Sequence, residues 1–202
     1  MIKTVLLTGF EPFNKASINP AWEAVRALGG WSGEHFRVEV RQLPCVSVEA
    51  KRVLAGMVDE LHPDIVIAVG QAGGRAEISV ERVAINVDDA SILDNAGQQP
   101  VDRRICEEGP AAYFTTLPIK AMVAAMREKG LRAGVSQTAG TFVCNHVFYG
   151  LMHHLAGKPV KAGFIHVPFL PEQAEERPDD PPAMPLDDII LGIMTAVETA
   201  VN

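Results

Sequence analysis

Clustered positive charge is missing from this sequence. Its 202 residues include 18 Lys and Arg against 25 Asp and Glu, giving a formal net charge of −7, and no basic run occurs. Contact with nucleic-acid phosphates requires grouped lysine and arginine side chains. We therefore expect no nucleic-acid partner, and small or neutral ligands instead.

Long apolar runs and regularly spaced cysteines are also missing. No stretch approaches the roughly 18 uninterrupted apolar residues of a membrane span, and the first apolar run is too short for a signal peptide. The three cysteines, Cys45, Cys106 and Cys144, are an odd number without short regular spacing, so neither a disulfide framework nor a zinc site is predicted. We expect a soluble cytoplasmic protein with no membrane contact, metal or cofactor.

The apolar segments alternate between strand and helix patterns. The alternation begins with a strand at 2–7 and a helix at 21–28, includes strands at 65–69 and 161–167, and ends with a helix at 186–201. This order favours an α/β fold, an α/β/α sandwich with a mostly parallel twisted sheet of the phosphorylase or hydrolase kind. The length predicts a single domain over 1–202. The acidic, proline-laden segment 171–185 is expected to be a solvated loop.

Cys144 is predicted to lie at the start of a helix. The apolar residues that follow at helical spacing are Val147, Phe148, Leu151 and Leu155. Free N–H groups and the positive end of the helix dipole stabilise a thiolate there, and also an oxyanion formed by attack on a carbonyl. The position of Cys144 is equally compatible with a small apolar residue at the start of the buried face of this helix. Cys45 and Cys106 are interpreted as packing or surface residues.

Two further residues are candidates for acid–base chemistry. Among six histidines, His166 lies near the carboxyl end of an apolar strand, where active-site residues of α/β proteins gather. The alternative is a core histidine bonded to a backbone carbonyl. Glu81 interrupts two extended apolar runs and either orients an imidazole or is an exposed carboxylate beside Arg82. Their order along the chain is no obstacle, since triads are defined by geometry.

Two loops supply candidate binding residues. Phe10 and Phe13 follow the first strand and would enclose a small flat ring, or else pack beneath the loop as local core. The glycine-rich segment 70–75 lacks the Lys-Ser/Thr of a P-loop and the GxGxxG spacing of a dinucleotide fold. We interpret it as backbone that approaches a ligand closely.

Together these segments resemble the pyrrolidone carboxyl peptidases, also called pyroglutamyl peptidases type I, over nearly the whole chain. The matching motifs lie at 9–13 with 19–20, at 70–75 with 78 and 81–86, at 136 with 139–140 and 142–145, and at 166–171. The resemblance implies a cysteine peptidase that removes N-terminal pyroglutamate from peptides. Cys144 would attack the scissile carbonyl, His166 would accept the thiol proton, and Glu81 would hold the imidazole, with an acyl-enzyme intermediate.

The same resemblance implies a binding site for the pyroglutamyl lactam. Phe10 and Phe13 would bracket the ring, and backbone groups around Gln71 and the segment near Phe142 and Val143 would contact its amide and carbonyl. Flat apolar walls with a few hydrogen bonds suit a neutral lactam. The family likeness further implies a homotetramer.

One segment departs from the family pattern. Where the family commonly has Arg-Ile-Pro-Asp-Asn, this chain has Ser91 followed by Ile-Leu-Asp-Asn. Loss of the arginine predicts lower activity or altered closure of the loop, without loss of the chemistry. The alternative function is a non-peptidase on the same scaffold, such as a nucleoside-phosphorylase-type enzyme that binds phosphate at 70–75.

Overall fold

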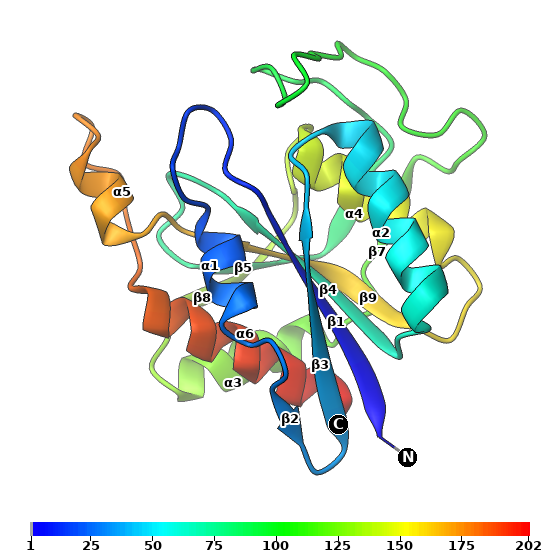
Figure 1. Ribbon diagram of the computed structural model, residues 1–202, viewed down its shortest axis with the longest axis vertical. Coiled ribbons are helices and arrows are strands. Elements are labelled where there is room, and N and C mark those ends of the chain that lie inside the picture. Colours follow the sequence, from blue (N-terminus) through cyan, green and yellow to red (C-terminus); the bar gives the residue numbers. More distant parts are fainter. Residues whose placement is uncertain (1) are drawn as a thin grey trace.

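The computed structural model describes residues 2–202 (Figure 1). Within these residues the main sheet has the strand order β2-β3-β1-β4-β9-β5-β8. Its strands are β1 (Lys3–Phe10), β2 (Ser32–Gly33), β3 (Phe36–Leu43), β4 (Ile65–Gln71), β5 (Ile78–Glu81), β8 (Ala133–Ser136) and β9 (Lys161–Val167). A separate antiparallel pair is formed by β6 (Val83–Ile85) and β7 (Ala112–Phe114).

The four central strands of the main sheet, β3, β1, β4 and β9, are parallel. β5 runs antiparallel to β9, β8 runs parallel to β5, and β2 pairs antiparallel with β3. The prediction of a mostly parallel sheet is therefore confirmed. The strand order places β5 beside β9 on the side opposite β4, which matters for the site described below.

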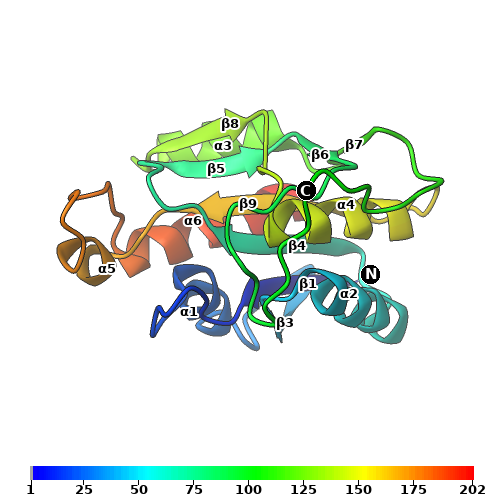
Figure 2. The same cartoon turned by 90° about the horizontal axis from the view of Figure 1, so that it is seen from above.

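Helices cover both faces of the sheet (Figure 2). They are α1 (Pro20–Arg26), α2 (Ser47–Leu61), α3 (Ile119–Glu128), α4 (Val143–His154), α5 (Pro171–Glu175) and α6 (Leu186–Val201). Strand residues alternate between the faces: Val5 and Leu7 of β1 join one apolar cluster with α1, α3 and α6, whereas Leu6 joins another with α2 and α4. The predicted α/β/α sandwich is confirmed.

Two strands extend further than their apolar runs predicted. The strand expected at 2–7 continues to Phe10, and the strand expected at 65–69 continues to Gln71. Both extensions carry a candidate binding residue at the end of the strand. Pairing with neighbouring strands fixes these residues, because Phe10 lies opposite Leu43 and Gln71 lies opposite Val167.

The prediction of a solvated loop at 171–185 is only partly right, since 176–185 lie outside the helices and 175–180 are exposed. Five of its residues form α5, and Gln173 and Met184 are buried. The segment is attached at Phe169, whose backbone carbonyl accepts a hydrogen bond from the Met184 amide at 2.9 Å and whose ring lies under the Arg177 guanidinium at 4.3 Å. The sequence pattern missed this because a helix of one turn has almost no periodicity and is stabilised by tertiary contacts.

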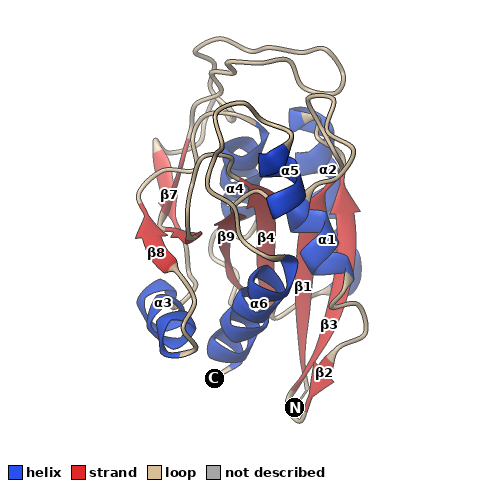
Figure 3. Ribbon diagram, turned by 90° about the vertical axis from the view of Figure 1, so that its left-hand side faces the viewer, coloured by secondary structure: helices blue, strands red, loops and turns tan. Residues whose placement is uncertain are grey.

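The long loops gather at one end of the sheet, opposite the chain termini (Figure 3). This end includes the carboxyl ends of the parallel strands, where residues from several loops converge. No helix in the described part of the chain is long and apolar enough to cross a membrane.

Candidate active site

Cys144 lies over the central strand of the sheet. It is the second residue of α4, and its sulfur is so close to Gly70 that a Cβ at Gly70 would lie 2.8 Å from Sγ. Gly70 is in β4, directly opposite His166 of β9. A glycine is therefore required beneath the thiol, and the parallel pairing of β4 with β9 brings Cys144 and His166 to the same part of the sheet.

The Cys144 end of α4 is held by a buried asparagine. Asn145 accepts a hydrogen bond from the Ile85 amide at 3.0 Å, and its Nδ2 donates to the carbonyls of Ile85 and Val87, both at 2.9 Å. These three bonds attach the first turn of α4 to β6 and its following loop. The residue beside the thiol thus serves as an anchor, and the direction of the helix N-terminus is fixed.

His166 and Glu81 form a buried pair. The imidazole Nδ1 donates to Glu81 Oε1 at 2.7 Å. His166 is 3% exposed and Glu81 is 0% exposed. Ser79 of β5 lies opposite His166, and Glu81, two residues further on, has its side chain on the same face. Because an ionised carboxylate only accepts hydrogen bonds, Nδ1 carries the proton and Nε2 is left as a base.

Arg75 completes this charged group. Its Nη1 donates to the same Glu81 Oε1 at 2.7 Å, and its Nη2 donates to the Thr138 carbonyl at 2.9 Å. The sequence placed Arg75 in a glycine-rich run and did not predict this ion pair. The available signal was Glu81 itself, since a carboxylate in an apolar strand requires a compensating cation when buried.

These contacts set the protonation states. Burial alone would raise the pKa of Glu81, but the hydrogen bond and charge of His166, together with the Arg75 guanidinium, outweigh burial and lower that pKa. Burial lowers the pKa of His166, and Arg75 lowers it further, against the opposing effect of Glu81. Burial also raises the pKa of the Cys144 thiol. Near neutral pH the site therefore holds an uncharged thiol, a neutral imidazole and a carboxylate.

A small cavity opens beside the thiol. The five predicted substrate-binding residues line it together with Cys144: they are Phe10, Phe13, Gln71, Phe142 and Val143. Its volume is about 40 Å³, against the roughly 10–15 Å³ that one water molecule requires. The rings of Phe13 and Phe142 lie 6.2 Å apart between centroids, tilted by 43°. The cavity is suited to one small, flat, uncharged group.

The remaining wall of the cavity includes Asn19 and Cys45. The Asn19 carboxamide caps α1 by accepting from the Ala21 amide at 3.1 Å, and it donates to the Glu11 carbonyl at 3.1 Å. Burial, with Glu11 and Asp94 adding to it, raises the pKa of Cys45 to about 12, so this thiol is an uncharged wall residue. Its interpretation as a packing residue agrees with this position.

The loop between β1 and α1, residues 11–19, is called the front loop here, and Glu11 bonds it to two other segments. Its Oε1 accepts from the Cys45 amide at 3.0 Å and from Asn95 Nδ2 at 2.8 Å. Asn95 also donates to the Pro12 carbonyl at 3.0 Å. The segment containing Ser91 thus contacts the front loop through Asn95. Ser91 itself is exposed and is not among the described residues that line the cavity.

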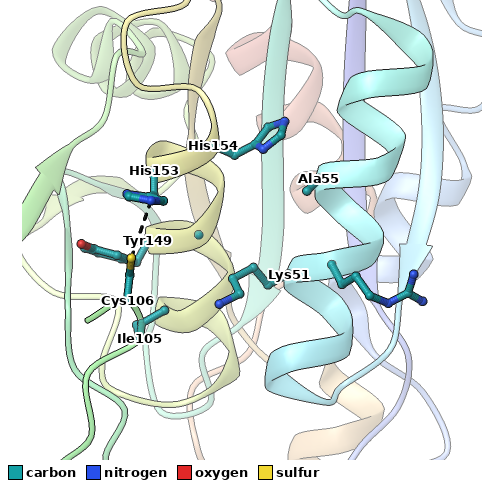
Figure 4. A pocket seen from close by; sticks show the side chains of 9 residues that line it. Lys51, Ala55, Ile105, Cys106, Tyr149, His153 and His154 are labelled. Atoms are coloured by element: carbon teal, nitrogen blue, oxygen red, sulfur yellow. Dashed lines mark hydrogen bonds between the residues drawn. The ribbon is translucent and has the colours of Figure 1, made fainter. Parts of the chain in front are cut away.

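A larger cavity, of about 350 Å³, lies between α2 and α4 (Figure 4). It contains a second cysteine–histidine pair, in which Cys106 Sγ and His153 Nε2 are 3.6 Å apart. The other ring nitrogen of His153 contacts the Tyr113 hydroxyl at 2.8 Å, so no carboxylate orients this imidazole. His153 lies nine residues after Cys144 on α4, roughly 14 Å along the helix axis. Cys106 is therefore remote from the first cavity.

The glycine-rich segment 70–75 packs closely against the ring of Phe169. A Cβ on Gly73 would lie 2.2 Å from the Phe169 ring, and Gly74 has a φ of +86° that favours glycine. The only arginine of the segment is the one paired with Glu81. Among residues 2–202, no group of three or more His, Cys, Asp or Glu side chains is placed to hold a metal ion.

Comparison with known proteins agrees with this arrangement. Residues 3–202 match the pyroglutamyl peptidase family. The chain belongs to this family. The pyrrolidone-carboxylate peptidase of Cupriavidus taiwanensis is 61% identical over 202 residues, with 98% of this chain and 93% of that protein covered. That of Brevibacillus brevis is 53% identical over 203 residues, covering 100% and 94%.

Solved structures of the family have the same fold. The crystal structure of pyroglutamyl peptidase I from Bacillus amyloliquefaciens superposes with a TM-score of 0.96 at 46% identity, covering 100% of this chain and 96% of that one. A mutant pyrrolidone carboxyl peptidase from Pyrococcus furiosus gives 0.95 at 42% identity, with 98% of both chains covered. The resemblance drawn from the motifs is confirmed. This member of the pyroglutamyl peptidase family is a hydrolase of the cysteine-peptidase type.

Proposed function

We propose that this chain hydrolyses the N-terminal pyroglutamyl residue from peptides, with Cys144 as nucleophile, His166 as base and Glu81 as the orienting carboxylate. One arrangement carries the proposal. Arg75, Glu81 and His166 form a hydrogen-bonded series that ends beside Gly70, and the sulfur of Cys144 lies over Gly70 at the wall of an apolar cavity. A nucleophile, an oriented base and a small binding site thus adjoin one another.

The proposed reaction begins with the lactam ring in the cavity and the scissile carbonyl over Cys144. Sγ bonds to the carbonyl carbon while its proton passes to His166 Nε2, and the oxyanion is stabilised by the N-terminus of α4. The imidazolium then gives its proton to the leaving amine as the C–N bond breaks. Water, deprotonated by His166, attacks the resulting thioester and releases pyroglutamate with the free thiol.

The protonation states support proton transfer during attack. Because the Cys144 thiol has a raised pKa and His166 a lowered one, the resting pair is neutral. The hydrogen bonds of residues 2–202 include none between Sγ and His166, and such catalytic contacts commonly tighten when substrate binds. Glu81 then stabilises the imidazolium that forms, as the carboxylate of a serine-protease triad does.

The cavity supports a lactam as the recognised group. In the proposal, Phe10, Phe13, Phe142 and Val143 contact the faces and edges of the ring, and Gln71 contacts its polar atoms. A neutral five-membered lactam leaves no charge unpaired against such walls, whereas a charged N-terminal amine would be desolvated without a partner.

The phosphorylase alternative receives no support from this arrangement. Phosphate binding at 70–75 would draw on Arg75, but Arg75 is paired with Glu81. A single peptidase domain over 1–202 is part of our proposal and is supported by the family match over residues 3–202. The homotetramer and the cytoplasmic location remain predictions, and light scattering on the purified chain tests the first of them.

The decisive experiment measures release of a chromogenic amine from a pyroglutamyl amide under reducing conditions. We expect turnover by the native chain, none by Cys144→Ala, and native turnover by Cys106→Ser, the matched control at the second cysteine–histidine pair. Mass spectrometry of a rapidly quenched reaction should find the pyroglutamyl group on the peptide that contains Cys144. A folded native chain without turnover, or a Cys144→Ala variant with native turnover, would refute the proposal.

A further inference from the structure

Gln173 is a buried polar residue that touches three separate parts of the site's surroundings. It lies in α5 and is 7% exposed. Its Oε1 accepts from the Leu170 amide at 3.0 Å, and its Nε2 donates to the Ile18 carbonyl at 3.4 Å and to Gln71 Oε1 at 3.2 Å. One carboxamide therefore joins the start of α5, the end of the front loop and a residue of the cavity wall.

Two of these partners determine how the Gln173 carboxamide is turned. A backbone amide can only donate, so the Leu170 N–H requires the oxygen of Gln173 on its side. A backbone carbonyl can only accept, so the Ile18 carbonyl requires the nitrogen on the other. Main-chain groups on both sides therefore decide which end of the Gln173 carboxamide is the oxygen and which is the nitrogen.

The orientation of the Gln173 carboxamide determines that of Gln71. Since Gln173 presents an N–H to it, Gln71 must offer its carbonyl oxygen in return. The NH₂ of Gln71 is then the part of its carboxamide left for the cavity that Gln71 lines. A donor in this position is complementary to a carbonyl oxygen on a bound ring, whereas an acceptor would repel it.

We propose that Gln173 is a positioning residue that sets the polarity of the binding cavity by holding Gln71 with its N–H toward the ligand. The inference rests on the proposed function, because it gives the cavity a preference for a ring that carries a carbonyl. A lactam has this oxygen and the saturated ring of an N-terminal proline lacks it. The specificity of the site is thereby determined in part from α5, outside the cavity wall.

Two substitutions separate positioning from simple support of the fold. In Gln173→Glu the carboxylate still accepts from the Leu170 amide, but it can donate neither to Gln71 nor to the Ile18 carbonyl. Gln71 is then expected to reverse, giving its N–H to Glu and its oxygen to the cavity. In Gln173→Ala the hydrogen bond from the Leu170 amide is lost. The Gln71 carboxamide also loses its partner, so it can turn but is not made to present its oxygen to the cavity.

The two variants should differ in ligand binding rather than in stability. Unfolding temperature should fall in both, because Gln173→Ala loses all three hydrogen bonds and Gln173→Glu buries a carboxylate beside the Ile18 carbonyl. Affinity for 2-pyrrolidone, measured as competitive inhibition, and kcat/KM for a pyroglutamyl amide should fall further in Gln173→Glu, roughly 10- to 100-fold against roughly three- to tenfold for Gln173→Ala. Most of the loss should appear in KM, and alkylation of Cys144 by iodoacetamide should keep its native rate.

The outcomes distinguish this inference from the proposed function. If the native chain cleaves the amide and Gln173→Glu retains native KM and pyrrolidone affinity, positioning by Gln173 is refuted while the peptidase stands. The same follows if both variants lose equal affinity for 2-pyrrolidone, since Gln173 is then a structural residue alone. A native chain that neither cleaves the amide nor binds 2-pyrrolidone refutes both.

Discussion

Arg75 and His166 bind the same oxygen of Glu81, each at 2.7 Å. The imidazole approaches from β9, and the guanidinium comes from the glycine-rich loop after β4. The carboxylate is fully buried, so it depends on both partners for its charge. Arg75 therefore affects the base through the carboxylate as well as through its own positive charge.

Removal of the Arg75 charge should shift the pH dependence of catalysis. Arg75 lowers the pKa of His166, so Arg75→Met should raise that pKa. Because the base must be neutral to accept the thiol proton, the acidic limb of kcat/KM should move to higher pH, and activity at pH 7 should fall. The measurement is a pH profile of kcat/KM. Arg82→Met is the control, since the Arg82 guanidinium donates to the Gln137 side chain at 2.9 Å and has no hydrogen bond to Glu81 among residues 2–202. An acidic limb that stays in place in Arg75→Met would contradict the prediction.

The sequence predicted the frame of the site because the frame depends on local pattern. The apolar runs at 65–69 and 161–167 became β4 and β9, and the helix predicted from Cys144 became α4. These elements are long and strongly apolar, so burial determines their structure. The nearness of Cys144 to His166 also required the order of strands in the sheet, which the family motifs supplied and periodicity did not.

The parts that were not predicted depend on contacts between distant segments. Arg75 reaches Glu81 only because β5 reverses direction beside β9. Gln173 is buried only because α5 packs near Gln71 and Ile18. Neither contact leaves a period in the sequence, and a polar residue in an acidic, proline-rich segment is typical of a loop. Charge pairing and tertiary hydrogen bonds therefore required the three-dimensional arrangement.

A methyl group beneath the thiol should disable the enzyme. In Gly70→Ala the new Cβ would lie 2.8 Å from both Cys144 Sγ and Phe164 Cζ, so the sulfur or the ring must shift. Misplacement of a reacting atom by about 1 Å costs roughly 100-fold in rate, and overpacking costs about 1–3 kcal/mol of stability. Activity of the folded variant and its denaturant midpoint test this.

Gly56→Ala is the matched control for that substitution. Gly56 is an exposed residue inside α2, and a Cβ there meets nothing within 4 Å. Alanine in a helix interior is favoured over glycine by about 0.5–1 kcal/mol, so stability should rise and activity should stay native. Native turnover in Gly70→Ala would show that the thiol does not depend on the close contact with β4.

His166 should contribute to loss of stability in acid. Its pKa is lowered in the folded chain, so below the unfolded value of about 6.5 the unfolded chain binds a proton that the folded chain does not. Stability is then lost as the pH falls from that value toward the lowered pKa. Glu81, whose pKa is also lowered, adds a loss at still lower pH.

A histidine substitution isolates this effect. In His166→Gln the difference in unfolding temperature between pH 8 and pH 5 should be smaller than in the native chain, because one proton-linked loss is removed. His35→Gln is the control at a histidine whose side chain is 70% exposed, and its difference should match the native one. An equal difference in His166→Gln would show that the buried imidazole is not responsible for the acid sensitivity.

Phe13 should determine binding more than chemistry. Its ring lines the cavity with that of Phe142, 6.2 Å away between centroids, whereas Phe10 is 2% exposed and is part of the core. Phe13→Ala should therefore raise KM for a pyroglutamyl amide by roughly tenfold or more while Cys144 keeps its native alkylation rate. Phe114→Ala, at a phenylalanine that is 70% exposed on β7, should leave KM unchanged. A fall in kcat at constant KM would instead indicate that Phe13 acts on the transition state, because only interactions made there change kcat alone.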